Sequence, residues 1–209
     1  MKHTAFDRFA GLCAILAGIV IFLYSIAFIV IARRAPELGG LLSALFLLLN
    51  GLLATAPLTA VYARLRELDA LFALWALVLG LAGALGAAVH GGFDLANTLN
   101  PPSLPADLAT ALAGLPSQVD PRGLLTFGVA GVALFVVAWL IGRGASLPRG
   151  LGYLAYLLAI LLVIIYVGRL TILNPANPVL LVPILLTGFL VNPAWYIWLG
   201  LVLWRGQRV

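Results

Sequence analysis

Long runs of apolar residues alternate with short polar segments along the whole chain. Six of these runs contain no Asp, Glu, Lys or Arg. A bilayer core about 30 Å thick takes roughly 20 helical residues to cross, and each run is about that long or longer. The sequence therefore predicts an all-α integral membrane bundle, built as one domain. Its six transmembrane helices are expected at residues 9–32, 39–62, 70–92, 123–142, 150–168 and 179–204.

The overall composition supports a membrane protein and argues against a soluble one. Hydrophobic residues make up 64% of the 209 residues, charged residues make up 9%, and the mean hydropathy is +1.15. A soluble domain of this size could not hide so much apolar surface from water. The net charge of +5 does not indicate a nucleic-acid partner, because the basic residues lie in short segments at the helix ends. Membrane lipids are the expected partners.

The distribution of basic residues predicts an orientation. If the chain starts inside, the inner segments hold eight of the twelve Lys and Arg residues and the outer segments hold four. This positive-inside bias places both termini in the cytoplasm. Eleven arginines against one lysine, with many Ala, Leu and Gly residues, favour a bacterial plasma membrane.

The third connection, residues 93–122, differs from the other short loops. It contains five prolines and three acids, and it lies outside under the predicted topology. Ser103 can cap a short helix there, since Pro is tolerated in a first helical turn and leucines recur at helical spacing. We expect an interfacial helix that rests on the outer leaflet, or alternatively a lid over an outward-facing cavity.

The third predicted helix carries both a packing signal and a candidate site. Gly80, Gly83 and nearby small residues form a face on which another helix can approach closely. Farther out, His90 and Asp94 stand four residues apart, so their side chains can meet if the helix continues past two weakening glycines. The sharper hypothesis is a ligand or proton site with Arg169 as an anion clamp. The alternative is a polar cap of purely structural value.

Few polar residues occur at mid-depth. Asn50 lies near the middle of the second predicted helix, and Asn192 precedes Pro193 in the sixth. Pro193 has no N–H and disfavours helical geometry at the residue before it, so we expect a kink or break there. A broken helix can expose backbone dipoles to a solute, whereas an ordinary proline only bends the helix.

The tryptophans predict an aromatic belt. All five fall in the inner halves of their helices, where an amphipathic ring can place its polar edge among headgroups. A stacking platform for a ligand is the alternative for the group around residues 195–198. The five belt residues are Trp75, Trp139, Trp195, Trp198 and Trp204.

No catalytic residue, cofactor or metal site is predicted. Cys13 is the single cysteine, so a disulfide or a cysteine metal site cannot form within the chain. His3 and His90 are expected at opposite membrane faces, so they cannot share one haem iron. The candidate ligand-binding residues are therefore His90, Asp94, Arg169, Asn192 and Asn50.

Three segments resemble a known class of proteins. HGGFDLAN follows the third helix, DPRGLLTFG opens the fourth and NPAWYIWLG lies in the sixth. With six helices and short loops, the chain resembles the small multi-pass bacterial membrane proteins catalogued as domains of unknown function. This resemblance implies an architecture and no activity.

Three functional hypotheses remain from the sequence. An accessory or scaffold protein, with a homo-oligomer or another membrane protein as partner, fits the lack of intramembrane charge and the small-residue faces. A binder or carrier of a lipid-like or small apolar molecule, with an outward-facing cavity, fits the apolar interior, the expected break at Asn192–Pro193 and the outer lid. An enzyme fits least, because the candidate residues define no reaction. The sequence favours the scaffold and keeps the binder as the alternative.

Overall fold

The computed structural model describes residues 4–100, 119–172 and 177–206 and contains no β-strand in them. Six helical spans are long and apolar enough to cross a membrane, so the protein is an all-α, multi-pass membrane bundle. The first span joins α1 (Ala5–Ser25) to η1 (Ile26–Ile31), the second is α2 (Pro36–Leu65) and the third is α3 (Ala70–Leu99). The fourth span follows η2 (Pro121–Gly123) and joins η3 (Leu124–Val129) to α5 (Ala130–Arg143). The fifth span is α6 (Arg149–Thr171). The sixth span joins α7 (Pro178–Leu186), η4 (Thr187–Val191) and α8 (Asn192–Arg205).

Most helices extend past the apolar runs that predict them. The side chain of Thr4 accepts a hydrogen bond from the Asp7 N–H, and Asp7 bonds back to the Thr4 N–H, so α1 starts in a capping box before its apolar run. The largest difference is in α3, which continues to Leu99 rather than ending at residue 92. The third loop therefore starts later than predicted. The expected interfacial helix from Ser103 lies outside the described residues.

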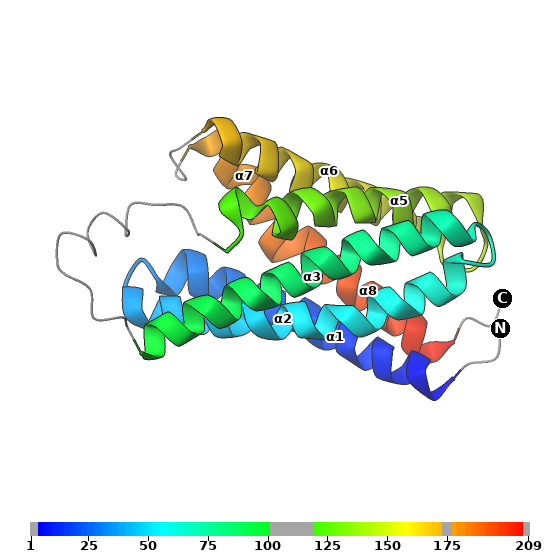
Figure 1. The fold of residues 1–209 in the computed structure, drawn as a ribbon, viewed down its shortest axis with the longest axis horizontal. Coiled ribbons are helices and arrows are strands. Elements are labelled where there is room, and N and C mark those ends of the chain that lie inside the picture. Colours follow the sequence, from blue (N-terminus) through cyan, green and yellow to red (C-terminus); the bar gives the residue numbers. More distant parts are fainter. Residues whose placement is uncertain (1–3, 101–118, 173–176, 207–209) are drawn as a thin grey trace.

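The six spans form a closed ring. Each span packs antiparallel against the next one in sequence, and α8 of the sixth span packs against α1 of the first. Figure 1 shows both termini at one end of the bundle, which we call the terminal end. The opposite end, which carries the first, third and fifth connections, is the distal end. The ribbons of α3 and α6 diverge toward the distal end (Figure 1).

Glycines allow close backbone contact between neighbouring spans. A Cβ atom at Gly51 of α2 would lie 2.6 Å from the backbone nitrogen of Ala88 in α3. One at Gly11 of α1 would lie 2.9 Å from the carbonyl oxygen of Gly200 in α8. Gly83 of α3 meets the fourth span, where a Cβ would be 2.9 Å from that of Ala130. The small-residue face of the third span is therefore used for packing inside the bundle.

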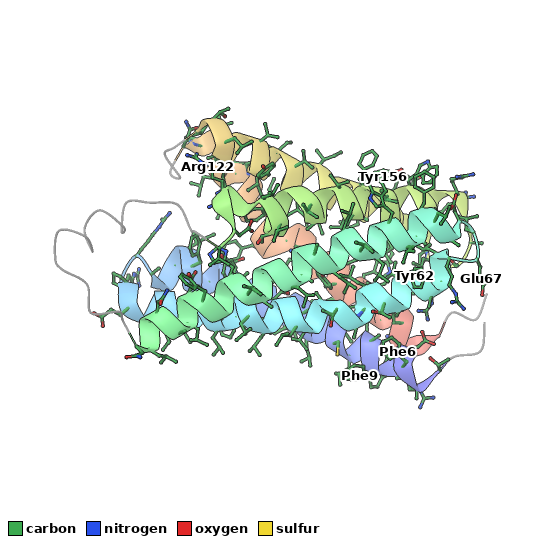
Figure 2. All side chains as sticks on the ribbon, in the orientation of Figure 1. Phe6, Phe9, Tyr62, Glu67, Arg122 and Tyr156 are labelled. Atoms are coloured by element: carbon green, nitrogen blue, oxygen red, sulfur yellow. The ribbon has the colours of Figure 1, made fainter. Side chains whose placement is uncertain are left out.

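The terminal half of the ring is filled by a dense apolar core. Trp195 is fully buried there, although the sequence placed it in the headgroup belt. That prediction is wrong for Trp195 because its ring points between the helices, while Trp75 and Trp204 are about half exposed on the outside. Figure 2 shows Tyr62 and Glu67 toward this end and Phe6 and Phe9 on α1. The large core side chains buried to at least 98% include Leu65, Leu140, Ile141, Leu147, Leu151, Leu158, Trp195, Leu199 and Leu203.

The distal half differs in its backbone. The π-helical segments η1, η3 and η4 belong to the first, fourth and sixth spans, and all three lie between mid-depth and the distal end. A π-helical turn inserts one extra residue into a helix and often accompanies a functional site. The polar side chains described next lie beside these segments.

Candidate binding site

His90 and Asp94 meet on α3 near the distal end. The His90 Nε2 atom lies 3.2 Å from Asp94 Oδ2, and the two side chains are 20% and 46% exposed. This contact requires an unbroken helix through Gly91 and Gly92, and α3 has one. Gly91 packs against the backbone of α2, where a Cβ would lie 2.7 Å from the carbonyl oxygen of Ala44. Tertiary packing therefore offsets the low helix propensity of this glycine pair.

Arg169, on the last turn of α6, supplies the cation of the site. Its guanidinium carbon lies 5.4 Å from the centre of the Phe127 ring, which is a cation–π contact. Gly123 has a left-handed backbone with φ of 80°, and a Cβ there would collide with Phe127. The glycine thus leaves room for the ring on which Arg169 rests.

Asp120 begins the fourth span and is 99% buried. Its carboxylate accepts hydrogen bonds from the Leu125 N–H at 2.9 Å, the Thr126 N–H at 3.0 Å and the Thr126 hydroxyl at 2.6 Å. Asp120 also interacts electrostatically with Arg169. Both carboxylate oxygens therefore accept hydrogen bonds from the first residues of the span, so the main role of Asp120 is to cap the helix.

Arg122 ties the fourth span to the fifth. It has φ of 58°, which is uncommon for a residue with a side chain, and its Nη1 donates to the Arg169 carbonyl oxygen at 2.6 Å. That carbonyl belongs to the last turn of α6, where carbonyls have no helical donor. Figure 2 shows Arg122 at the distal end of the bundle. Arg122 therefore holds the backbone that carries Arg169 in place.

Tyr24 of α1 lies between the two charged parts of the site. Its phenol group is near enough to Arg169 and Asp94 for both charges to act on it. The site thus offers guanidinium, imidazole and phenol donors beside one carboxylate, contributed by the first, third and fifth spans. A partly buried guanidinium with such neighbours is suited to a phosphate or carboxylate.

Asn50 and Asn192 lie deeper. Of the predicted kink or break, the break does not occur, because Asn192 keeps helical geometry with φ of −69° and ψ of −49°. The sixth span accommodates Pro193 by widening into η4, where the Asn192 N–H donates to the Thr187 carbonyl oxygen. Four buried side-chain atoms have no hydrogen-bond partner in the described part of the chain: the Oδ1 atoms of Asn50 and Asn192, the Thr187 hydroxyl oxygen and the Trp195 indole nitrogen.

The aromatic group at residues 195–198 does not form a single platform. Trp195 and Tyr196 contact each other edge to face, with ring centres 4.9 Å apart. Trp198 instead lines a surface hollow with Arg205 at the terminal end, far from His90 and Arg169 along the helices.

The structure brings His90, Asp94 and Arg169 to one end of the bundle and places Asn50 and Asn192 toward mid-depth. Sequence reasoning missed Tyr24, Asp120 and Thr187 as parts of these sites. Asp120 had a usable signal, because an Asp just before a Pro and an apolar run is typical of a helix start. Tyr24 and Thr187 lie within apolar runs and carry no such signal. A scan against protein-family models, a search of curated proteins and a search of solved structures each found no match.

Proposed function

We propose that this protein binds an amphipathic molecule whose anionic headgroup, a phosphate or a carboxylate, pairs with Arg169 at the distal end. The observation that carries the proposal is the state of this guanidinium. Among the described residues, Asp7 pairs with Arg64 and His90 contacts Asp94, and Arg169 takes part in neither contact. The carboxylate that interacts with Arg169, that of Asp120, already accepts three hydrogen bonds from Leu125 and Thr126. A partly buried guanidinium can therefore accept a further anion as its partner.

The surroundings of Arg169 support an amphiphile rather than a small soluble anion. Its aromatic neighbour Phe127 and the apolar surface of α6 border the guanidinium, so acyl chains can extend along the bundle. Asp94 is almost half exposed, so the headgroup would lie at the bundle surface rather than in an enclosed pocket. His90 and Tyr24 would add hydrogen bonds to the same headgroup.

The scaffold hypothesis rested on the lack of intramembrane charge and on small-residue faces. The packing of the third span inside the bundle removes its glycine face as a reason to prefer the scaffold. Gly80 packs on Leu58, and Gly83 packs on Ala130, within the same chain. That face is not free to bind a second protein.

For localisation we propose the bacterial plasma membrane, with both termini in the cytoplasm, on the basis of the arginine distribution. The distal site would then face the outside of the cell. With the terminal half packed by apolar side chains, a ligand would reach this site from the distal side, as suits a binder or carrier.

Native mass spectrometry of the purified protein tests the proposal with three probes: phosphatidylglycerol, phosphatidylethanolamine and diacylglycerol. We expect adducts with the two phosphate-bearing lipids and weaker binding of diacylglycerol. Arg169→Gln should weaken phospholipid binding about tenfold to a hundredfold, as expected for the loss of a charge-assisted hydrogen-bond pair of about 1.5–3 kcal/mol. The matched control is Arg34→Gln, an exposed arginine at the same end.

Equal binding of diacylglycerol and phospholipid, or unchanged binding by Arg169→Gln, would overturn the proposal. A stoichiometric protein partner without any lipid adduct would support the scaffold hypothesis instead.

A further inference from the structure

Three oxygen atoms at mid-depth lack hydrogen-bond partners. They are Oδ1 of Asn50 and of Asn192 and Oγ1 of Thr187, and each is fully buried. Thr187 as a whole is 95% buried. An unpaired polar atom in a protein interior costs about 1–3 kcal/mol, and native proteins satisfy nearly all of them. Three such oxygens point to something that they bind together.

The packing of the sixth span on the second relates the positions of the two asparagines. Tyr196 of α8 packs against a cluster formed by Ala54 and Leu58 of α2 and Ala84 of α3. Both spans run from the distal end to the terminal end, so they are parallel. Asn192 precedes Tyr196 by one helical turn, and Asn50 precedes Ala54 by one turn. Asn50 and Asn192 therefore lie at the same level of the bundle, one turn to the distal side of this contact.

Thr187 joins them through the π-helical segment η4. The Asn192 N–H donates to the Thr187 carbonyl oxygen, so Thr187 lies one π-helical turn to the distal side of Asn192. The next residue, Pro193, has no N–H to donate. In a regular helix the N–H at position 193 would donate to the carbonyl of Gly188 (π-helical geometry) or of Phe189 (α-helical geometry). These two carbonyls therefore lack this donor. Both belong to the same segment of the sixth span as Thr187.

The chemistry of these atoms selects a class of ligand. Neutral amide, hydroxyl and carbonyl oxygens suit a hard cation, and helix irregularities that release carbonyls are used in this way in membrane transporters. None of the oxygens comes from a carboxylate, and a divalent cation is usually bound by one or more carboxylates. We propose that Asn50, Thr187 and Asn192 bind a monovalent cation of sodium size, which is independent of the headgroup site at Arg169.

The surrounding residues determine the access route. On the terminal side of the oxygens, Trp195, Leu199 and Leu203 are fully buried and close the interior. On the distal side lie His90, Asp94 and Tyr24, which are polar. On this proposal the cation would enter and leave from the distal end, because the terminal side is closed by the apolar core.

The experiment uses the full chain, purified in detergent without sodium. Thermal unfolding is followed while sodium chloride replaces choline chloride at constant ionic strength, and binding of radioactive ²²Na⁺ is measured in parallel. We expect a saturable rise of the melting temperature with Na⁺ that choline does not produce. Thr187→Val keeps the side-chain shape and should abolish both the rise and ²²Na⁺ binding.

Two further variants make the result decisive. Thr187→Ser retains the hydroxyl oxygen and should retain Na⁺ binding, while Thr171→Val, at an exposed position of α6, should behave like the unmodified protein. The proposal is overturned if no ²²Na⁺ binds, or if Thr187→Val binds it unchanged. Arg169→Gln should leave the Na⁺ response intact while weakening lipid binding, so each proposal can fail without the other.

Discussion

Replacement of Gly51 by alanine tests whether backbone contact between the second and third spans stabilises the ring. The added Cβ would collide with the carbonyl oxygen of Ala84 and lie 2.6 Å from the Ala88 nitrogen. Ordinary contacts of this kind are about 3.4 Å or more, so the two helices must separate locally. Overpacking of this type costs about 1–3 kcal/mol. The backbone atoms of a helix cannot rotate away as a flexible side chain can.

Gly40→Ala is the matched control in the same helix. A Cβ at Gly40 meets nothing within 4 Å. Both substitutions gain the same helix propensity of about 1 kcal/mol, so this contribution cancels when the two variants are compared. The remaining difference is the cost of the contact, about 1–3 kcal/mol, or about 2–4 °C of melting temperature for each kcal/mol.

The assay is thermal unfolding of both variants, monitored by the fraction that remains monodisperse in size-exclusion chromatography after heating. Gly51→Ala should melt several degrees below Gly40→Ala. If the two variants melt together, the second and third spans are not in backbone contact at Gly51 and the packing argument fails.

Three further predictions concern other parts of the molecule. Asp7→Asn should destabilise the protein by about 1–3 kcal/mol, because it weakens the 2.8 Å ion pair with Arg64, and adding Arg64→Met should recover part of the loss in a thermal melt. Asp120→Ala should lower the free energy of unfolding by about 1–3 kcal/mol, because three donors at the start of the fourth span lose their acceptor. A melting temperature equal to that of the unmodified protein would contradict this role. In a cysteine-free background, Arg34→Cys should react with an impermeant thiol reagent added to intact cells and Arg66→Cys should not; the reverse pattern would invert the proposed topology.

The helices could be predicted from the sequence because lipid leaves few options for the backbone. An apolar run without charges must satisfy its own N–H and C=O groups, and a helix does so within the run. The ends of the helices were less predictable. Polar residues such as Thr98 continue the helix beyond the apolar run, and a hydropathy pattern does not identify such residues as helical. Gly91 and Gly92 seemed to weaken α3, yet the contact of Gly91 with α2 keeps the helix intact.

The candidate sites were predictable only where neighbours in sequence are neighbours in space. The contact of His90 with Asp94 follows from a spacing of four residues on one helix. The approach of Tyr24 to Arg169 depends on how the ring of helices closes, and no local pattern contains that information. Trp195 shows the same limit: the apolar runs are hydrophobic on all sides, so the sequence does not show which side faces lipid.

The pairing of α1 with α8 has a consequence for biogenesis. Gly11 and Gly18 of the first span complete their contacts only with residues of the sixth, at Gly200 and Pro193. During synthesis these glycines therefore face lipid until the last span has been inserted. Ring closure is the final step of assembly, and a nascent chain that stalls before it would leave an open array of helices for membrane quality control to recognise.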